Sequence, residues 1–407
     1  MTPPIDRREF LKGLSAAAAM GLVSGAAGAV PFTGPALPAP SHSRLPRWRG
    51  FNLLEKFIAS VENAPFREED FAWISQWGFN FVRLPLSYRC WSGPENWREL
   101  REPVLREIDD AVEMGRRHGV HVCLNFHRAP GYSVDRSLKE PFNLWTDAEA
   151  LEACTYHWRH FAARYRDVPN SALSFDLLNE PGERNPATGE LLDDATYARV
   201  VRALVEGIRS ESPHRLIIAD GLMWGNVPVP ALAGLGIAQS GRGYRPMQVT
   251  HWKADWVKGS DAWPRPQWPL ENPPAAIDAD RKQLAALRQV FRENPIFMGY
   301  ARDEDLMLPW GRERFRRQLI APWKELERMG VGVHIGEFGA HNMTPHDVVL
   351  GWMGDLLPCL AEAGWGWALW NLRGSFGVLD SERADVHYEN FHGHQLDKKM
   401  LELLRNS

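Results

Sequence analysis

Short apolar runs alternate with longer amphipathic segments along most of this chain. Eight runs have the length and composition of buried strands: residues 49–54, 80–86, 121–127, 173–180, 215–220, 247–252, 332–338 and 365–371. Between several of them, apolar residues recur at helical spacing, most clearly over 103–118 and 194–210. Because strands that alternate with helices imply a parallel sheet, eight such units predict an α/β protein with a closed (β/α)8 TIM barrel.

An open, doubly wound sheet is the alternative architecture. Such sheets often carry a glycine-rich phosphate loop after the first strand, and neither G-x-G-x-x-G nor a Walker loop stands there in this sequence. The longest irregular stretch, 253–310, follows the sixth run; it is rich in Pro and Trp and contains one helical segment at 278–291. The next helix is expected at 311–329. In a barrel the insertion would lie on the face of the C-terminal strand ends, which favours a lid or cleft wall over a separate domain.

The first 29 residues have the pattern of an export signal. Arg7 and Arg8 precede Phe-Leu-Lys, and an apolar stretch rich in Ala and Gly then ends in a small-x-small cleavage site. This resembles a twin-arginine signal, which predicts a periplasmic or secreted protein. An uncleaved membrane anchor is the alternative, but the stretch is short and poor in Leu, so we expect no integral membrane protein after cleavage. Residues 30–47 are Pro-rich and predict a linker, leaving 48–407 as the folded catalytic domain.

Composition excludes several classes of protein. The chain has 44% hydrophobic and 24% charged residues, the balance of a soluble globular protein. Its 47 Lys and Arg against 51 Asp and Glu give a net charge of −4, which provides no field for a phosphate backbone, so no nucleic-acid partner is expected. The four cysteines lie far apart without a C-x-x-C motif, which argues against a structural zinc site and a disulfide-built scaffold but leaves their pairing open.

Two glutamates stand at the ends of apolar runs. Glu180 is followed at once by Pro181, and Glu337 closes another apolar run just before Gly339. Side chains at the C-terminal ends of barrel strands face the mouth of the barrel, where active sites lie. Two facing carboxyl groups are what glycoside hydrolysis requires, because one protonates the leaving oxygen and the other attacks the anomeric carbon. Either glutamate alone would more simply be explained as a member of a structural ion pair.

The sequences around these glutamates resemble the two catalytic signatures of glycoside hydrolase family 5, the cellulase family. Further stretches match that family in order: Arg49-Gly-Phe-Asn52, Trp77-Gly-Phe-Asn80-Phe-Val-Arg83, Asn125-Phe-His127, His251 and Gly366-Trp-Ala-Leu-Trp370. The resemblance spans roughly residues 48–405. Asn-Glu-Pro alone is a weak signal, whereas the ordered set is specific.

The resemblance implies a role for each matched residue. Glu180 would be the acid/base and Glu337 the nucleophile of a retaining reaction, with carboxyl groups about 5–5.5 Å apart. The implied substrate-binding residues are Asn179 on the sugar 2-hydroxyl, Arg83 beside Glu337, His127 and His251 on hydroxyls or on the glutamates, and Trp370 under the sugar ring. The family needs no cofactor, and the histidines show no metal-ligand spacing such as H-E-x-x-H.

Two features depart from the family pattern. Many members have His-x-Tyr in the sixth strand, the tyrosine bonding the nucleophile, but Lys253 stands two residues after His251. Another residue would then supply the hydroxyl, with Tyr300 as a candidate. The loop from His127 to Tyr132 resembles the exo-1,3-β-glucanase branch of the family, which leaves the subfamily open.

We therefore expect a retaining hydrolase of β-linked glucan or a related poly- or oligosaccharide, first of all an endo-β-glucanase of cellulase type. Exo-acting β-glucosidase or exo-1,3-β-glucanase action, or β-mannan hydrolysis, is the alternative, and the insertion at 253–310 would favour exo action if it closed the cleft. A carbohydrate-binding barrel that has lost catalysis is a second class of function, but it would lack one of the two glutamates. A metal-dependent barrel hydrolase is a third class, and it would need His and Asp ligands at several strand ends. Ten of the 18 tryptophans follow strands, and we expect about half of those to line the cleft.

Overall fold

The computed structural model describes residues 37–407 apart from 61–62, 136–137, 183–190, 273–276, 279, 283, 286–287, 289–293, 295 and 297–301. The predicted signal segment 1–29 and half of the residues of the predicted helix 278–291 lie outside the described residues. The domain start near residue 48 stays a prediction, although packing begins earlier. Leu45 is buried, and the Gly332 amide donates a hydrogen bond of 2.7 Å to the carbonyl oxygen of His42.

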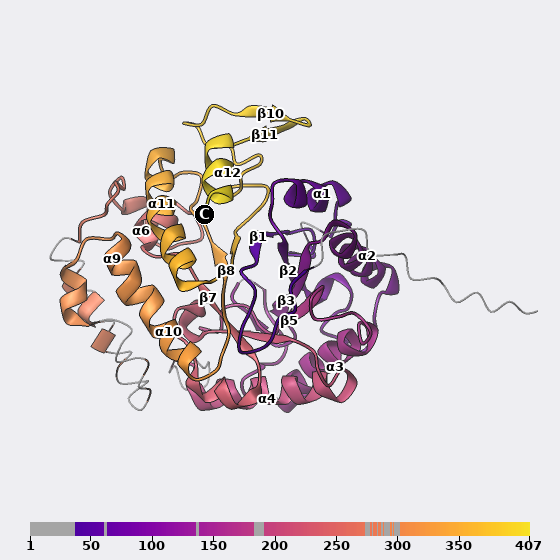
Figure 1. The fold of residues 1–407 in the computed structure, drawn as a ribbon. Helices are drawn as coiled ribbons and strands as arrows, with labels where there is room; N and C mark the ends of the chain where they lie inside the picture. The colour runs from indigo at the N-terminus through magenta and orange to yellow at the C-terminus, as the bar shows by residue number, and fades with distance from the viewer. Residues whose placement is uncertain are drawn as a thin grey trace, which may run out of the picture. The chain divides into compact units, whose positions relative to one another are not determined.

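Eight parallel strands close into a barrel with helices around it (Figure 1). The barrel strands are β1 (Arg49–Asn52), β2 (Phe81–Ser87), β3 (His121–Ala129), β5 (Leu173–Asp176), β6 (Ile217–Asp220), β7 (Ala238–Arg242), β8 (Val333–Phe338) and β9 (Trp367–Leu369). Strand β1 pairs with both β2 and β9, and this double pairing closes the sheet. A short β4 (Tyr132–Ser133) runs antiparallel to the end of β3. The predicted (β/α)8 fold is confirmed.

The helices follow the amphipathic segments of the sequence. They are α1 (Glu68–Gln76), α2 (Glu102–His118), α3 (Ala148–Arg164), α4 (Asp194–Glu211), α5 (Leu222–Gly225), α6 (Met247–Thr250), α9 (Arg312–Phe315), α10 (Ala321–Arg328), α11 (His346–Ala363) and α12 (Lys398–Arg405). A π-helical turn, Arg316–Ile320, joins α9 to α10, so the predicted helix at 311–329 is confirmed, as are those at 103–118 and 194–210. Helix α2 ends at Gly119 with a left-handed φ of 65°, a conformation that glycine adopts without steric cost. None of the helices in the described part of the chain is long and apolar enough to cross a membrane.

The predicted sixth strand at 247–252 is wrong. Residues 247–250 form the short helix α6, and the sixth barrel strand is β7, nine residues earlier. Strand β7 reads Ala-Gln-Ser-Gly-Arg and is buried throughout, yet it has no apolar pattern. Its buried Gln239 exchanges two hydrogen bonds with the backbone of Val229, at 2.9 and 2.8 Å, so a polar side chain is satisfied where an apolar one was expected. The long insertion still follows the sixth strand.

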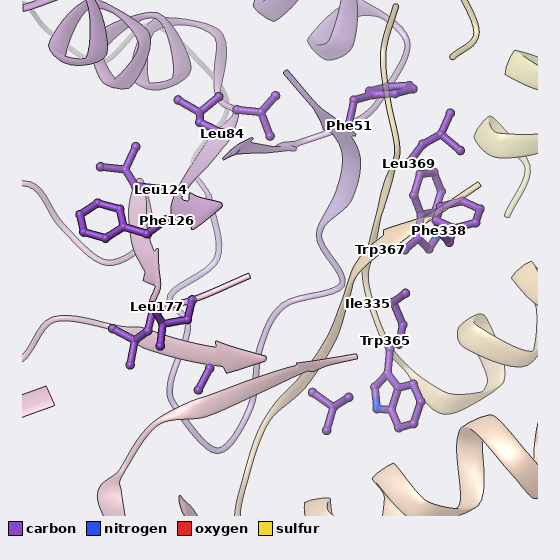
Figure 2. Packing of buried hydrophobic residues seen from close by; sticks show 14 of the residues in the cluster. Phe51, Leu84, Leu124, Phe126, Leu177, Ile335, Phe338, Trp365, Trp367 and Leu369 are labelled. Atoms are coloured by element: carbon purple, nitrogen blue, oxygen red, sulfur yellow. The ribbon is translucent and has the colours of Figure 1, made fainter. Parts of the chain in front are cut away.

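The core lies between the outer face of the barrel and the helices. Apolar side chains such as Leu84, Leu124, Phe126, Phe338 and Trp367 form this layer, part of which Figure 2 shows. All four cysteines are buried and free, consistent with small packing residues.

A second apolar group fills the inside of the barrel near the N-terminal strand ends. It includes Trp48, which stacks on His121 with ring centroids 3.8 Å apart. His334 is also buried there, with Nε2 at 3.4 Å from the Trp48 carbonyl oxygen.

Candidate active site

The interior of the barrel changes from apolar to charged toward the C-terminal ends of its strands. Phe81 lies inside the barrel, and Arg83, two residues later on β2, points the same way because side chains alternate with a period of two. Ile218 and Asp220 repeat this change on β6, and β7 ends in Arg242. These charged side chains are almost completely buried. The sheet therefore holds a cluster of ionic groups at the mouth of an apolar barrel.

The two predicted catalytic glutamates belong to this cluster. Glu337 lies on β8 and is 3% exposed. Glu180 lies beyond the end of β5 with a left-handed φ of 51°, and its side chain is 17% exposed. Its backbone is held on both sides, because its amide donates to Asp220 Oδ2 at 2.8 Å and its carbonyl oxygen accepts from the Tyr132 hydroxyl at 2.7 Å. A non-glycine residue in this conformation requires such support.

One guanidinium contacts both glutamates. Arg242 Nε donates to Glu180 Oε1 at 3.1 Å, and Arg242 Nη2 lies 3.3 Å from Glu337 Oε1. Asp220 accepts from the same guanidinium, at 3.0 Å from Nη1 and also from Nη2. The two carboxyl groups therefore lie next to the same guanidinium, while their predicted separation of about 5–5.5 Å stays a prediction.

Arg83 contacts Glu337 from β2. Its Nη1 donates to Glu337 Oε1 at 2.6 Å and to Asn52 Oδ1 at 3.1 Å. Its Nε donates to Asp176 Oδ2 at 2.8 Å, and its Nη2 donates to Asn179 Oδ1 at 2.8 Å. The structure thus places Arg83 where the family resemblance expects it, beside the presumed nucleophile. Charge-assisted hydrogen bonds of this kind are shorter and stronger than those between neutral groups.

Asn179 connects the ionic cluster to an aromatic wall. Its Oδ1 accepts from both Arg83 and Arg242, the latter at 2.9 Å, so its amide nitrogen faces His127 Nε2 at 3.3 Å. His127 therefore accepts at Nε2 and carries its proton on Nδ1. Burial lowers the pKa of His127 well below its ordinary value, which keeps the ring neutral. Trp370 stacks on His127 with centroids 5.4 Å apart. Four of the predicted site residues are thus brought together around the two glutamates.

The surroundings of Glu180 favour its protonated form. Burial, followed by the negative charge of Glu337, raises the pKa of Glu180 to about 8, although Arg242 opposes the shift. Burial and the charge of Asp220 raise the pKa of Asp176 to about 7. Burial opposes the charge on Arg242, but Asp220 and the two glutamates together raise its pKa well above the ordinary value, so it stays a cation. The geometry therefore places a carboxyl group that tends to hold its proton beside a second carboxyl group that two arginines contact.

Tyr244 supplies the hydroxyl that the sequence had left unassigned. Its hydroxyl donates to Glu337 Oε2 at 3.1 Å. The comparison of Lys253 with the family tyrosine was therefore wrong, and the Lys253 amine lies over the Trp252 ring instead. His251 lies at the end of α6, not in a strand, with Nδ1 at 2.9 Å from Thr250 Oγ1 and its ring edge-on to Tyr244. Tyr300, the other candidate, lies outside the described residues.

Arg242 and Tyr244 escaped prediction because their strand was assigned to the wrong segment. A usable signal was present: a single arginine between Gly241 and Gly243, followed by a tyrosine, in a stretch too polar for an ordinary barrel strand. No group of three His, Cys, Asp or Glu side chains that could hold a metal ion occurs in the described ranges.

Half of the ten tryptophans expected at the mouth are buried: Trp91, Trp97, Trp145, Trp252 and Trp310. Two others of the ten are exposed to solvent, Trp224 to 38% and Trp256 to 58%. The Trp224 ring packs on the backbone just after Glu180, since a Cβ on Gly182 would lie 2.7 Å from it. Trp256 contacts His341 edge-on at 5.0 Å and Phe376 at 6.1 Å.

Comparisons with known proteins agree with this geometry. The family described as Cellulase (glycosyl hydrolase family 5) matches residues 46–243. A solved structure titled as that of a glycoside hydrolase is 34% identical, with a TM-score of 0.75, and the match covers 88% of this chain and 99% of that one. Endoglucanase C of Acetivibrio thermocellus is 25% identical over 79% of this chain and 88% of its own length. Cel5A of Thermotoga maritima, solved with mannotriose, shares the fold with a TM-score of 0.60 at 20% identity, over 88% of this chain and 97% of its own. The chain therefore belongs to glycoside hydrolase family 5 and is a glycosidase that hydrolyses O-glycosyl bonds.

Proposed function

We propose that this protein is a retaining endo-β-glucanase in which Glu180 is the acid/base and Glu337 the nucleophile. The observation that carries the proposal is the contact of one guanidinium with both carboxyl groups, whose surroundings differ. The surroundings of Glu180 raise its pKa to about 8, so this carboxyl group holds a proton near neutral pH. Glu337 accepts hydrogen bonds from Arg83 and Tyr244. Similarity to Endoglucanase C over most of both chains supports a β-glucan as substrate and internal cleavage.

In the first step the Glu337 carboxylate attacks the anomeric carbon while the bond to the leaving oxygen breaks. Glu180 gives its proton to that oxygen, and the glucan fragment leaves as an alcohol. In the second step water attacks the glycosyl ester, Glu180 takes the proton of the water, and Glu337 is released as a carboxylate. Two displacements at one carbon restore the β configuration.

The overall reaction is tested by product analysis. Cellohexaose should be cut at internal bonds from the start, and proton NMR should show the β anomer of the new reducing end before mutarotation. Release of glucose alone from one chain end would favour the exo-acting alternative suggested by the loop from His127 to Tyr132. First appearance of the α anomer would exclude a retaining mechanism.

Tyr244→Phe should lower kcat on an aryl β-cellobioside by roughly 10- to 100-fold. The variant loses the hydroxyl that donates to Glu337 Oε2, and a hydrogen bond to a charged group contributes about 1.5–3 kcal/mol. Steady-state kinetics measure the loss, and the melting temperature checks that the fold is intact. Tyr388→Phe is the matched control, because that hydroxyl bonds Ser381 and Arg383 and should not affect kcat. A Tyr244→Phe enzyme with wild-type kcat would contradict the assignment.

The exposed tryptophans are expected to bind sugar rings outside the reacting unit. Trp224 packs on the backbone just after Glu180, the proposed proton donor. Trp256 contacts Phe376, which contacts Tyr244 with ring centroids 6.3 Å apart, and Tyr244 donates to Glu337. Loss of one stacking contact costs about 1 kcal/mol. Trp224→Ala or Trp256→Ala should therefore lower kcat/KM on cellohexaose by roughly three- to tenfold and leave a short aryl glucoside less affected. Equal loss on both substrates would argue for a structural role of these rings.

A further inference from the structure

Glu180 has two carboxyl oxygens in unequal settings. Oε1 accepts from Arg242 Nε at 3.1 Å, whereas no donor among the described residues contacts Oε2. A protonated carboxyl group has one hydroxyl oxygen and one carbonyl oxygen, and the carbonyl oxygen is the better acceptor. Because Arg242 can only donate, it selects Oε1 as the carbonyl oxygen. The proton of the acid form therefore resides on Oε2.

Arg242 is itself held so firmly that its direction is fixed. Its side chain is 1% exposed, and Asp220 contacts two of its nitrogens. Nη1 also donates to Ser240 Oγ and Nη2 to Asn179 Oδ1, at 3.2 and 2.9 Å. The loop after β6 covers its stem, since a Cβ on Gly225 would lie 2.5 Å from Arg242 Cγ. A cation packed in this way keeps its Nε aimed at Glu180 without reorganisation during the reaction.

We propose that Arg242, held by Asp220, is a positioning residue that directs the proton of Glu180 to Oε2 and thus to the leaving-group oxygen. This inference rests on the proposed function. In the first step the proton moves from Oε2 to the glycosidic oxygen as the bond from carbon to oxygen breaks and Glu337 bonds the anomeric carbon. Arg242 then pairs with the carboxylate that Glu180 has become, until water returns a proton to it and its oxygen displaces Glu337.

Arg242 and Asp220 carry opposite charges, so their effects on the ionisation of Glu180 can be measured separately. The groups that face Glu180 or Arg242 from neighbouring elements are Arg83, His127, Tyr132, Asp176, Tyr197, Asp220, Tyr244 and Glu337. Among them Asp220 raises the pKa of Glu180, and Arg242 lowers it. Neutralising Arg242 should therefore move the alkaline limb of kcat/KM to higher pH, and neutralising Asp220 should move it to lower pH. General loss of packing would not produce shifts of opposite sign.

The test uses Arg242→Met, Asp220→Asn and the double variant, on 2,4-dinitrophenyl and phenyl β-cellobiosides. A dinitrophenolate leaves without protonation, whereas phenolate needs the acid. Arg242→Met should lose at least about tenfold more kcat/KM on the phenyl substrate, a share of the roughly 10²–10⁴-fold effect of general acid catalysis. Arg328→Met, at an exposed arginine of α10, is the matched control and should behave as wild type.

The double variant keeps the test decisive, because Arg242→Met alone leaves Asp220 buried without its partner. The double variant retains no unpaired charge there and should still show the selective loss on the phenyl substrate. Equal losses on both substrates, or an alkaline limb that moves in neither single variant, would overturn the inference. Glu180→Ala serves as the reference: if it lacks the leaving-group dependence, the acid/base assignment itself is refuted and the role of Arg242 with it. If Glu180→Ala shows the dependence and the Arg242 variants do not, only the inference fails.

Discussion

Replacement of Glu337 by alanine is expected to lower kcat on an aryl β-cellobioside by roughly 10⁴- to 10⁶-fold, the range lost when a covalent nucleophile is removed. Glu337 accepts hydrogen bonds from Arg83 and Tyr244, and alanine removes this acceptor from both donors. Azide can enter the vacated space and attack the anomeric carbon from the same side. It should therefore restore activity and give an α-glycosyl azide, since a single displacement inverts the configuration.

The matched control is Glu402→Ala, at an exposed position of α12 far along the chain from the site, which should keep wild-type kcat. Measurement of kcat with and without azide, and NMR of the azide product, complete the test. Two outcomes would contradict the assignment of Glu337: activity within tenfold of wild type, or a β-glycosyl azide as the rescued product.

Glu180→Ala is the second large effect. The variant lacks the proton donor, so kcat/KM on a phenyl glycoside should fall by roughly 10²–10⁴-fold, while a dinitrophenyl glycoside, which needs no protonation, should keep most of its value. Azide should here give the β-glycosyl azide, because it attacks the covalent intermediate in place of water. The two alanine variants thus differ in the configuration of the rescued product, which separates the two roles.

The pH dependence follows from the raised pKa of Glu180. The first step needs the protonated acid, so wild-type kcat/KM should be maintained below about pH 8 and fall as the pH rises through the pKa of about 8. Glu180→Ala should abolish this alkaline limb. Glu55→Gln is the matched control, because Glu55 is another buried carboxyl group, with a pKa raised to about 7 by burial and by Asp70. If the limb disappears in Glu55→Gln and persists in Glu180→Ala, a different group controls the reaction.

The barrel and its two glutamates were predictable because the sequence there follows simple rules. Strand β8 is an apolar run that ends at a carboxylate, and its burial is complete, so the pattern and the fold agree. The same rule fails for β7, whose outward positions are Gln239 and Gly241. The first is satisfied by backbone hydrogen bonds, and a Cβ at the second would lie 3.0 Å from the Trp323 ring. The Trp323 ring leaves little room for a side chain at position 241, so β7 lacks the apolar side chain by which a strand is predicted from sequence.

The ionic cluster shows a second limit of sequence reading. Asp220 and Arg242 stand 22 residues apart, and the pairing of β6 with β7 brings them together beside Glu180. Position along the chain likewise identified which tryptophans follow strands but not how deeply they are buried. Trp91 and Trp145 follow strands and are buried, whereas Trp224 and Trp256 are exposed. The position of a residue relative to its strand predicts which end of the barrel it lies on. The burial of its side chain depends on residues from distant segments.

The central claim, that Glu337 forms the covalent intermediate of a retaining β-glucanase, is tested most directly by trapping. A 2-deoxy-2-fluoro-β-cellobiosyl fluoride should glycosylate the enzyme with release of fluoride and leave a long-lived glycosyl-enzyme. Its fluorine at C2 slows both displacements, and its good leaving group speeds only the first. Peptide mapping by mass spectrometry should then find one fluorocellobiosyl group on the peptide that contains Glu337. Absence of a covalent adduct on active enzyme, or an adduct on Glu180 or any other residue, would contradict the account.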